Sequence, residues 1–332
     1  MTINEIAQMA GVSRATVSRY LNDGYVSDEK RRRIAAVIEE TGYTPSVSAQ
    51  LLRSHHTNFI GVIIPKLNSD SISRMADGIS RKLAKEGYQL LLACTENNEL
   101  NELKYLSLFQ ENNVDGIILF GTIFTPEHRK LLKALDVPVV ILAQHENGFS
   151  CIYSDDYTAA HELGMHLAKT ATEVGLISVT PSDEAVGKNR RDGFLDAFRE
   201  NGLKVMKSHI AISGFDAASG EKAALSLLKK YPSIDTLVCV TDTIASGASR
   251  AIRTLGLSIP DDIQLSGFGD STISTVLYPS LTTVHLYYDK AGESAASLLL
   301  NHIKEPDTPV NEIKYSFDLK IRESTRKKEA DR

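Results

Sequence analysis

The hydrophobic positions of the chain from Asn58 onward follow a repeating pattern, in which short apolar runs alternate with amphipathic segments. The amphipathic segment 71–86 carries Ile72, Met75 and Ile79 on one stripe, as a helix with a single buried face does. Near-continuous apolar runs are typical of parallel strands that are buried on both faces. Such runs occupy residues 59–65, 88–95, 115–121 and 137–143. The pattern therefore predicts a parallel sheet whose strands alternate with helices.

A second series of the same kind follows the first. Its strands are predicted at residues 173–180, 235–241 and 262–269, and its helices at 156–170, 184–201, 215–230 and 242–254. Two such series predict an α/β core of two doubly wound lobes. Strand-like segments at 281–288 and 314–321 are expected to cross between the lobes. A ligand is then expected in the cleft at the strand ends.

The first 22 residues have a different pattern, which predicts two short helices joined by a tight turn. Thr2 and Glu5 form the Thr-x-x-Glu capping box that starts a helix. Gly11 can adopt the left-handed conformation that ends it, and Ser13 caps a second helix over residues 14–21. This arrangement is a helix-turn-helix, whose second helix reads the major groove of DNA.

A third helix is predicted after the turn at Asp23, with Ser27 as its N-cap and Gly42 at its end. Pro45 prevents the helix from continuing. Residues 46–53 can form only about two helical turns, whereas an isolated helix needs about 12–15 residues to be stable in water. This segment should be helical only when something else supports it.

The composition is that of an ordinary soluble protein, with 42% hydrophobic and 24% charged residues among 332. The net charge is −5, but residues 1–57 hold seven Lys and Arg against six Asp and Glu. Arg14, Arg19 and the basic run 30–33 suit DNA phosphates, although the run equally fits a solvated helix face. No apolar run is long enough to span a bilayer, and the N-terminus does not resemble a signal peptide. We therefore expect a cytoplasmic protein without membrane contacts.

The chemistry-bearing residues argue against an enzyme. Gly187-Lys188 lacks the first glycine and the following Ser or Thr of a phosphate loop, and His161 and His166 lack the spacing of helical metal ligands. We predict no catalytic residues, no metal and no cofactor. The three cysteines lie far apart in apolar surroundings, which predicts free thiols in a reducing compartment. They are Cys94, Cys151 and Cys239.

The order A-G-V-S-x-x-T-V-S-R-x-L-N over residues 10–22 resembles the DNA-reading headpiece of the lactose-repressor family of bacterial transcription regulators. The resemblance extends to about residue 324. It implies a homodimer that binds a pseudo-palindromic operator, and a core of the periplasmic-binding-protein type I fold. The DNA-binding residues that it implies in the headpiece are Thr2, Ser13, Arg14, Ala15, Thr16, Ser18, Arg19 and Asn22.

In this family the segment that corresponds to 46–53 is a hinge helix, and Ala49 and Leu52 match its pattern. The resemblance implies that the two hinge helices of a dimer fold together in the minor groove, where each Leu52 is wedged between base steps. Residues 1–44 are then the DNA-binding domain and 45–57 the hinge and linker.

The remaining chain divides, on the same resemblance, into an effector-binding and dimerisation core and a tail. The core is expected at residues 58–324, with an N-lobe at about 58–153 plus 285–312 and a C-lobe at about 154–284 plus 313–324. The tail is expected at residues 325–332.

The resemblance also implies which residues contact the effector. They are Asn68, Ser69, Ser71, Ile72, Tyr153, Arg190, Phe215, Asp242 and Asp270. Arg190 matches a ligand-clamping arginine, and Phe215 matches an aromatic residue that stacks on the ligand. The family usually has an aspartate where this chain has Gly269, so either Asp270 takes over hydroxyl binding or the pocket is wider. We favour the second reading, with room for a disaccharide.

The segments YLNDGYVSDEK and KLNSDSISRMADGI resemble the sequences of sucrose-operon repressors of this family. They imply a repressor of a carbohydrate-utilisation operon that is released by sucrose or a related or phosphorylated sugar. Trehalose, a fructoside, a nucleobase corepressor and a phosphoprotein coregulator remain alternatives. A solute-binding transport protein with the same core would have a signal peptide in place of the helix-turn-helix.

Overall fold

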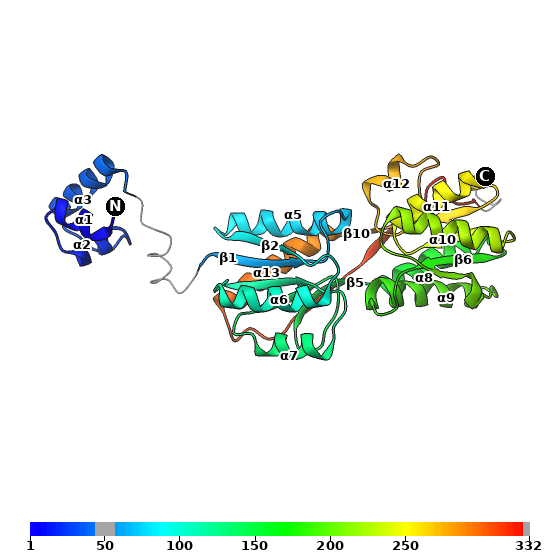
Figure 1. Ribbon diagram of the computed structural model, residues 1–332, viewed down its shortest axis with the longest axis horizontal. Helices are drawn as coiled ribbons and strands as arrows, with labels where there is room; N and C mark the ends of the chain where they lie inside the picture. Colours follow the sequence, from blue (N-terminus) through cyan, green and yellow to red (C-terminus); the bar gives the residue numbers. More distant parts are fainter. Residues whose placement is uncertain (44–56, 328–332) are drawn as a thin grey trace. The chain divides into compact units, whose positions relative to one another are not determined.

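The computed structural model describes residues 1–43 and 57–327 (Figure 1). Contacts divide the chain into two compact units, Met1–Thr57 and Asn58–Arg332. The predicted hinge helix at 46–53, with Ala49 and Leu52, lies outside the described residues. Within the described part of the chain, no helix is both long and apolar enough to cross a membrane.

In residues 1–43 the first unit forms a small bundle of three helices, α1 (Ile3–Met9), α2 (Arg14–Tyr20) and α3 (Asp28–Thr41). The capping box of Thr2 and Glu5 is present, and the Ser13 side chain accepts a hydrogen bond from the backbone amide of Thr16. Ile6, Val17 and Ile34, one from each helix, are fully buried and form the centre of the core. The predicted helix-turn-helix is confirmed. Ser27 is the N-cap of α3, but its side chain makes no capping bond.

Two arginines of the basic run 30–33 make contacts with other residues of the headpiece. Arg33 Nη2 donates hydrogen bonds to the carbonyl oxygens of Ala10, at 2.6 Å, and Gly11, at 2.9 Å. Arg31 lies over the Tyr20 ring, with its guanidinium carbon 5.4 Å from the ring centroid. The end of a helix leaves backbone carbonyl groups without partners. Arg33 therefore supplies hydrogen-bond donors to the carbonyl groups of the turn between α1 and α2.

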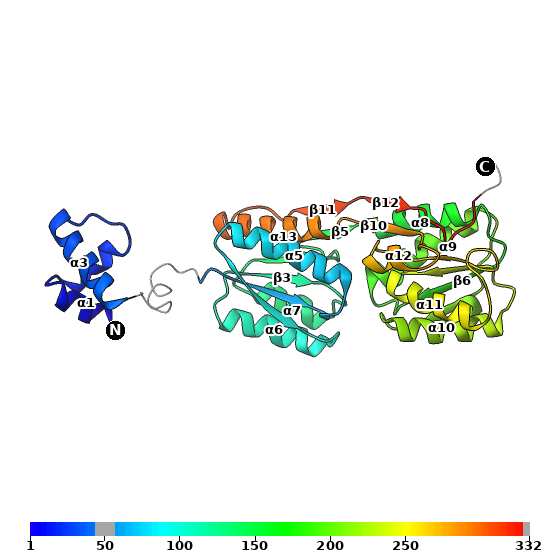
Figure 2. The same cartoon turned by 90° about the horizontal axis from the view of Figure 1, so that it is seen from above.

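The N-lobe of the second unit is built on a six-stranded parallel sheet with the order β11-β5-β4-β3-β1-β2. Its strands are β1 (Phe59–Ile64), β2 (Gln89–Cys94), β3 (Gly116–Phe120), β4 (Val139–Leu142), β5 (Ser150–Ser154) and β11 (Glu312–Tyr315). One face is covered by α5 (Asp70–Lys85) and α13 (Tyr288–Lys304), and the other by α6 (Glu99–Glu111) and α7 (Pro126–Ala134) (Figure 2). A Cβ atom on Gly292 would lie 2.0 Å from the Met75 carbonyl oxygen, so this glycine lets α13 approach α5 closely.

The C-lobe has a four-stranded parallel sheet with the order β7-β6-β8-β9. Its strands are β6 (Val174–Ser178), β7 (Ile210–Ile212), β8 (Thr236–Cys239) and β9 (Gln264–Ser266). Its helices are α8 (Asp156–Leu167), η1 (Glu184–Asn189), α9 (Arg190–Glu200), η2 (Lys207–His209), α10 (Ala217–Lys230), α11 (Asp242–Thr254) and α12 (Thr272–Val276). The single helix expected at 184–201 is thus two segments, because its first six residues form the π-helix η1. The two-lobed α/β fold is confirmed.

The described residues of the core cross between the lobes at three places. The chain passes from β5 to α8, from β10 (Thr283–Leu286) to α13, and from β11 to β12 (Phe317–Lys320). β10 and β12 pair antiparallel, whereas β11 pairs in parallel with β5. Residues 313–315 therefore belong to the N-lobe sheet, and the last crossing lies about three residues later than expected.

The expected tail begins too early at residue 325. Thr325 is 4% exposed, and Arg326 holds the chain against the C-lobe. Its guanidinium donates to the Asp235 carboxylate at 3.0 Å and to the carbonyl oxygens of Pro260, Thr170, Asp235, Asp261 and Asp262. The sequence offered no hydrophobic pattern here, because polar bonds make the attachment, and Thr325 Oγ1 adds one to Thr282 Oγ1 at 2.8 Å.

We predict that Arg326→Ala lowers the free energy of unfolding by about 2–3 kcal/mol, since hydrogen bonds to charged groups are worth about 1.5–3 kcal/mol. Urea unfolding followed by circular dichroism measures this loss. Lys327→Ala, at the exposed neighbouring position, is the matched control. Equal stability of the two variants would contradict an anchoring role for Arg326.

Candidate functional site

A cavity of about 1030 Å³ lies between the two lobes of the core. Residues that follow strands of both sheets line it, including Pro65 after β1, Gly121 after β3 and Thr241 after β8. The carboxyl ends of parallel strands meet at one edge of a sheet, which is where α/β folds bind ligands. The volume is at the upper end of the range of about 300–1000 Å³ that is usual for small-molecule pockets.

The structure brings eight of the nine expected effector residues to this one cavity. They are Asn68, Ser69, Ser71, Ile72, Tyr153, Arg190, Phe215 and Asp242. The first four lie in the loop after β1 and the first turn of α5, and Tyr153 lies on β5 where the chain leaves the N-lobe. The other three come from the C-lobe.

Arg190 is the most constrained of these residues, because it is 5% exposed and binds several elements at once. Its Nε donates to Asp156 Oδ1 at 2.7 Å and its Nη1 to the Val240 carbonyl oxygen at 2.8 Å. Its guanidinium carbon lies 4.0 Å from the centroid of the Phe268 ring. Burial lowers the pKa of Arg190, but the Asp156 carboxylate and Tyr288 outweigh it and raise the pKa above its ordinary value. Arg190 is therefore a permanent cation in the cavity wall.

Asp242, at the start of α11, organises the loop that follows β9. Its Oδ1 accepts from Thr283 Oγ1 at 2.6 Å, and its Oδ2 accepts from the Ser271 amide at 2.7 Å and hydroxyl at 3.0 Å. Burial raises the pKa of Asp242, although these hydrogen bonds oppose the shift. The hydrogen bonds of Asp242 with Thr283 and Ser271 thus hold this part of the cavity wall in place.

The structure corrects the assignment of Asp270, which does not line the cavity. Its carboxylate accepts from Arg322 Nη2 at 2.5 Å and from His285 Nδ1 at 2.8 Å. Arg322 and His285 lie far from Asp270 in sequence, so these partners were not visible there. The neighbours Gly269 and Ser271 line the cavity instead.

Phe215 faces the cavity together with a residue that sequence reasoning missed. Lys66 Nζ lies 5.1 Å from the centroid of the Phe215 ring and donates to the Phe215 carbonyl oxygen at 3.4 Å. Burial lowers the pKa of Lys66, while Asp216 opposes the shift. Lys66 lies two residues before Asn68, the first expected contact, so its position after β1 was the available signal. The contact of Lys66 with Phe215 thus joins the N-lobe to the C-lobe at the cavity.

A second bond between the lobes was also missed. Gln144 Nε2, after β4, donates to Asp183 Oδ1 at 3.0 Å and to the Thr122 carbonyl oxygen at 3.2 Å. The same Asp183 oxygen accepts from the Val186 amide and caps η1. π-Helical turns are frequent at functional sites. Here η1 joins Asp183, the partner of Gln144, to Arg190 in the cavity wall.

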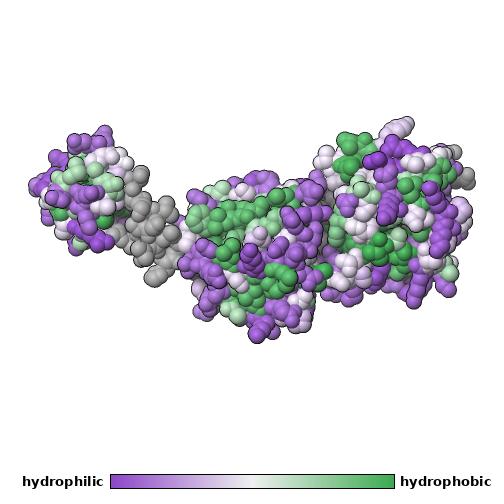
Figure 3. Space-filling model, viewed as in Figure 1, coloured by the Kyte–Doolittle hydropathy of each residue, from purple (hydrophilic) through white to green (hydrophobic). Residues whose placement is uncertain are grey.

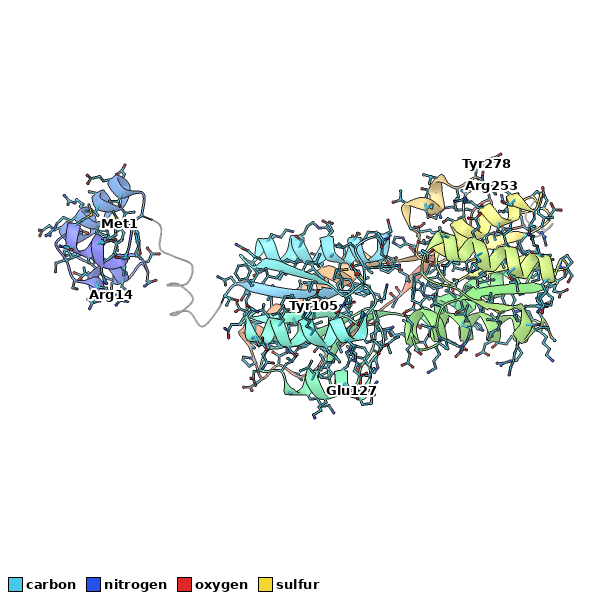
Figure 4. All side chains as sticks on the ribbon, viewed as in Figure 1. Met1, Arg14, Tyr105, Glu127, Arg253 and Tyr278 are labelled. Carbon is cyan, nitrogen blue, oxygen red and sulfur yellow. The ribbon has the colours of Figure 1, made fainter. Side chains whose placement is uncertain are left out.

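The expected DNA-reading residues lie mostly on the surface of the headpiece. Arg14, Ala15 and Arg19 on α2 are exposed, while Thr16 and Ser18 are partly exposed. Figure 4 shows the Arg14 side chain extending from the headpiece surface. Thr2, Ser13 and Asn22 are exposed as well, and Asn22 Nδ2 donates to the Ser18 carbonyl oxygen at 2.7 Å, which continues the helix end.

Family comparisons match nearly all of this chain. Residues 2–46 match the model described as bacterial regulatory proteins, lacI family. Residues 57–323 match the model described as periplasmic binding proteins and sugar binding domain of LacI family. The chain belongs to the LacI family. It is thus a transcription regulator with a DNA-binding helix-turn-helix and a sugar-binding type of core, and not an enzyme.

Characterised members of the LacI family resemble the chain over most of its length. The sucrose operon repressor of Staphylococcus xylosus is 32% identical over 90% of this chain and 92% of its own. The transcriptional regulator TreR of Salmonella typhimurium is 30% identical over 91% and 94%. The ribose operon repressor of Halalkalibacterium halodurans is 31% identical over 98% and 97%.

Solved structures of the LacI family share the fold. The lac repressor dimer bound to operator and the anti-inducer ONPF has a TM-score of 0.87 at 22% identity, covering 98% of this chain and 99% of its own. The CelR–cellobiose complex has a TM-score of 0.75 at 23% identity, covering 98% and 99%.

The buried ion pair of Arg190 with Asp156 predicts that removing Arg190 destabilises the fold. We expect Arg190→Ala to lower the free energy of unfolding by about 3–5 kcal/mol, because Asp156 would stay buried without its cation. Urea unfolding measures the loss, and Arg191→Ala, at the partly exposed neighbouring position, is the control. If Arg190→Ala is as stable as the control, the guanidinium serves the ligand alone.

Proposed function

We propose that this LacI-family protein is a cytoplasmic homodimer that represses a carbohydrate-utilisation operon and leaves its operator when sucrose or a related disaccharide binds between the core lobes. The observation that carries the proposal is the large cavity lined by hydroxyl, amide and carboxylate groups beside Phe215, in a chain that also has a DNA-reading headpiece. Its similarity to a sucrose operon repressor supports the choice of sugar.

The polar lining suits a ligand that carries many hydroxyl groups. Asn68, Ser69 and Ser71 offer donors and acceptors from the N-lobe, and Arg190 offers donors from the C-lobe. The Phe215 ring supplies an apolar surface against which the C–H face of a sugar ring can pack. Ile72 and Tyr153 complete the walls.

DNA recognition is assigned to the exposed face of the headpiece. Arg14 and Arg19 are suited to bases and phosphates, and Thr2, Ser13, Ala15, Thr16, Ser18 and Asn22 to the surrounding contacts. From the family resemblance we propose that Ala49 and Leu52 enter the minor groove in a hinge helix that folds on DNA. Sugar binding then changes the lobe arrangement and the support for the hinge, which couples the two sites thermodynamically.

The homodimer is proposed to form at the open edge of the N-lobe sheet. β2 is the last strand there, and its Leu91 and Leu92 are 36% and 45% exposed. Hydrophobic residues gather on the N-lobe face that Figure 3 shows. An uncovered edge strand with exposed leucines suits pairing with a second copy, and C2 dimers are the commonest oligomers.

The function is tested with operator sequences selected from random DNA by the purified protein. Fluorescence anisotropy then measures operator affinity with sucrose, trehalose, ribose and a purine base. Sucrose or another disaccharide should weaken binding by about 5–150-fold, the usual range of allosteric coupling. Release by the purine base or by ribose alone would overturn the proposed ligand class.

Arg19→Ala should cost about 1–3 kcal/mol on the selected operator and relax the preference at one base pair of each half-site. The reason is that a guanidinium in the major groove reads the edge of one guanine. Anisotropy on the operator and on random DNA separates the outcomes. An equal loss on both DNAs would show that Arg19 contacts phosphate only.

Leu92→Asp should convert the protein to monomers and weaken operator binding, since a charge at the edge strand opposes its pairing. Light scattering after size exclusion measures the mass. Val310→Asp is the matched control, because Val310 is 54% exposed beside β11 at the opposite edge of the same sheet. A dimeric Leu92→Asp variant would place the dimer interface elsewhere.

A further inference from the structure

We infer that the cavity selects an uncharged carbohydrate and excludes the phosphorylated form of the same sugar. This inference rests on the proposed function, and it specifies the charge of the ligand. It comes from the way carboxylates are arranged at the helix starts around the cavity.

Six helical segments of the described core place a carboxylate in the cavity lining at their N-cap or first residue, whereas α9 begins there with Arg190 and α13 with Tyr288. The six carboxylates belong to Asp70 in α5, Glu99 in α6, Asp156 in α8, Asp183 before η1, Asp216 before α10 and Asp242 in α11. A helix N-terminus has free amides and a partial positive charge, and it is where proteins commonly bind phosphate. In η1 and α10 the carboxylate is the N-cap and binds a first-turn amide directly. In the other four segments it is the first helical residue, where its negative charge offsets the positive helix end.

The hydrogen bonds show how this compensation is made. Asp183 accepts from the Val186 amide at 2.9 Å, and Asp216 accepts from the Ser219 amide at 2.9 Å. Both amides belong to the first turn of the segment that the aspartate caps. A phosphate that approached these ends would meet carboxylate oxygens instead of free N–H groups.

The cations of the cavity do not offset this charge. Among the described residues, the lining contains seven carboxylates, with Glu96 in addition to the six above, against Lys66 and Arg190. Arg190 is committed to Asp156 at 2.7 Å. Lys66 therefore faces the remaining carboxylates as the one cation of the lining without a carboxylate hydrogen bond.

The interior of the cavity also strengthens repulsion. Asp183 and Asp242 are buried, with 7% and 2% of their surface exposed, so water screens their carboxylates poorly. Coulomb interactions grow as the effective dielectric constant falls. A phosphate dianion would enter this field at a penalty, whereas neutral hydroxyl groups can donate to carboxylate oxygens in charge-assisted hydrogen bonds.

The test compares each sugar with its own phosphate ester. Isothermal titration calorimetry measures the binding of sucrose, sucrose 6-phosphate, trehalose and trehalose 6-phosphate to the full-length protein. The neutral sugar that binds should do so at least about tenfold more tightly than its ester at low salt. Its affinity should change little between about 50 mM and about 500 mM salt, because no net charge enters the site.

A charge variant supplies a second readout. In Glu96→Gln/Glu99→Gln the repulsion falls, so the affinity ratio of neutral sugar to ester should shrink several-fold at low salt and less at high salt. Glu111→Gln, at the far end of α6 and outside the lining, should leave the ratio unchanged.

The outcomes separate the two ideas. Tighter binding of an ester than of its neutral sugar, or an unchanged ratio in the double variant, overturns the charge inference and leaves the proposed regulator intact. Failure of both members of both pairs to bind overturns the disaccharide assignment itself.

Discussion

The ion pair of Arg190 with Asp156 is the interaction on which the cavity depends. It joins the first residue of α8 to the first residue of α9, and the same guanidinium reaches the end of β8 through Val240 and covers Phe268. A buried charge is tolerated only with a partner and further hydrogen bonds, and each of these is supplied by a different element. Strand ends of the C-lobe are thereby held in one arrangement around the ligand site.

The lobes meet at the cavity through few polar contacts. Lys66 reaches Phe215, and Gln144 reaches Asp183. Such contacts are individually modest in free energy, so a ligand with a few new hydrogen bonds can change which lobe arrangement is preferred. The π-helical turn η1 lies between Asp183, which binds Gln144 of the N-lobe, and Arg190 in the cavity wall.

The carboxylates around the cavity serve two ends. Asp183 and Asp216 stabilise η1 and α10 by accepting from their first-turn amides, and the cavity lining as a whole carries more carboxylates than cations. In the headpiece the arginines divide in a similar way. Arg31 and Arg33 contact other headpiece residues, while Arg14 and Arg19 on α2 are exposed. In each unit, therefore, some charged residues stabilise the fold and others of the same sign are proposed to act in recognition.

The sequence by itself determined the helix-turn-helix and the two α/β lobes, because hydrophobic periodicity, caps such as Thr2 and Ser13, and turn glycines act through local contacts. The family resemblance named nine effector candidates, and eight of them line the cavity between the lobes. Only the tertiary structure decided the partners of Asp270, the anchoring of Arg326 and the contacts of Lys66 and Gln144. These are polar contacts between residues distant in sequence, and no periodic pattern records them, since their geometry exists only after the strands and helices have packed.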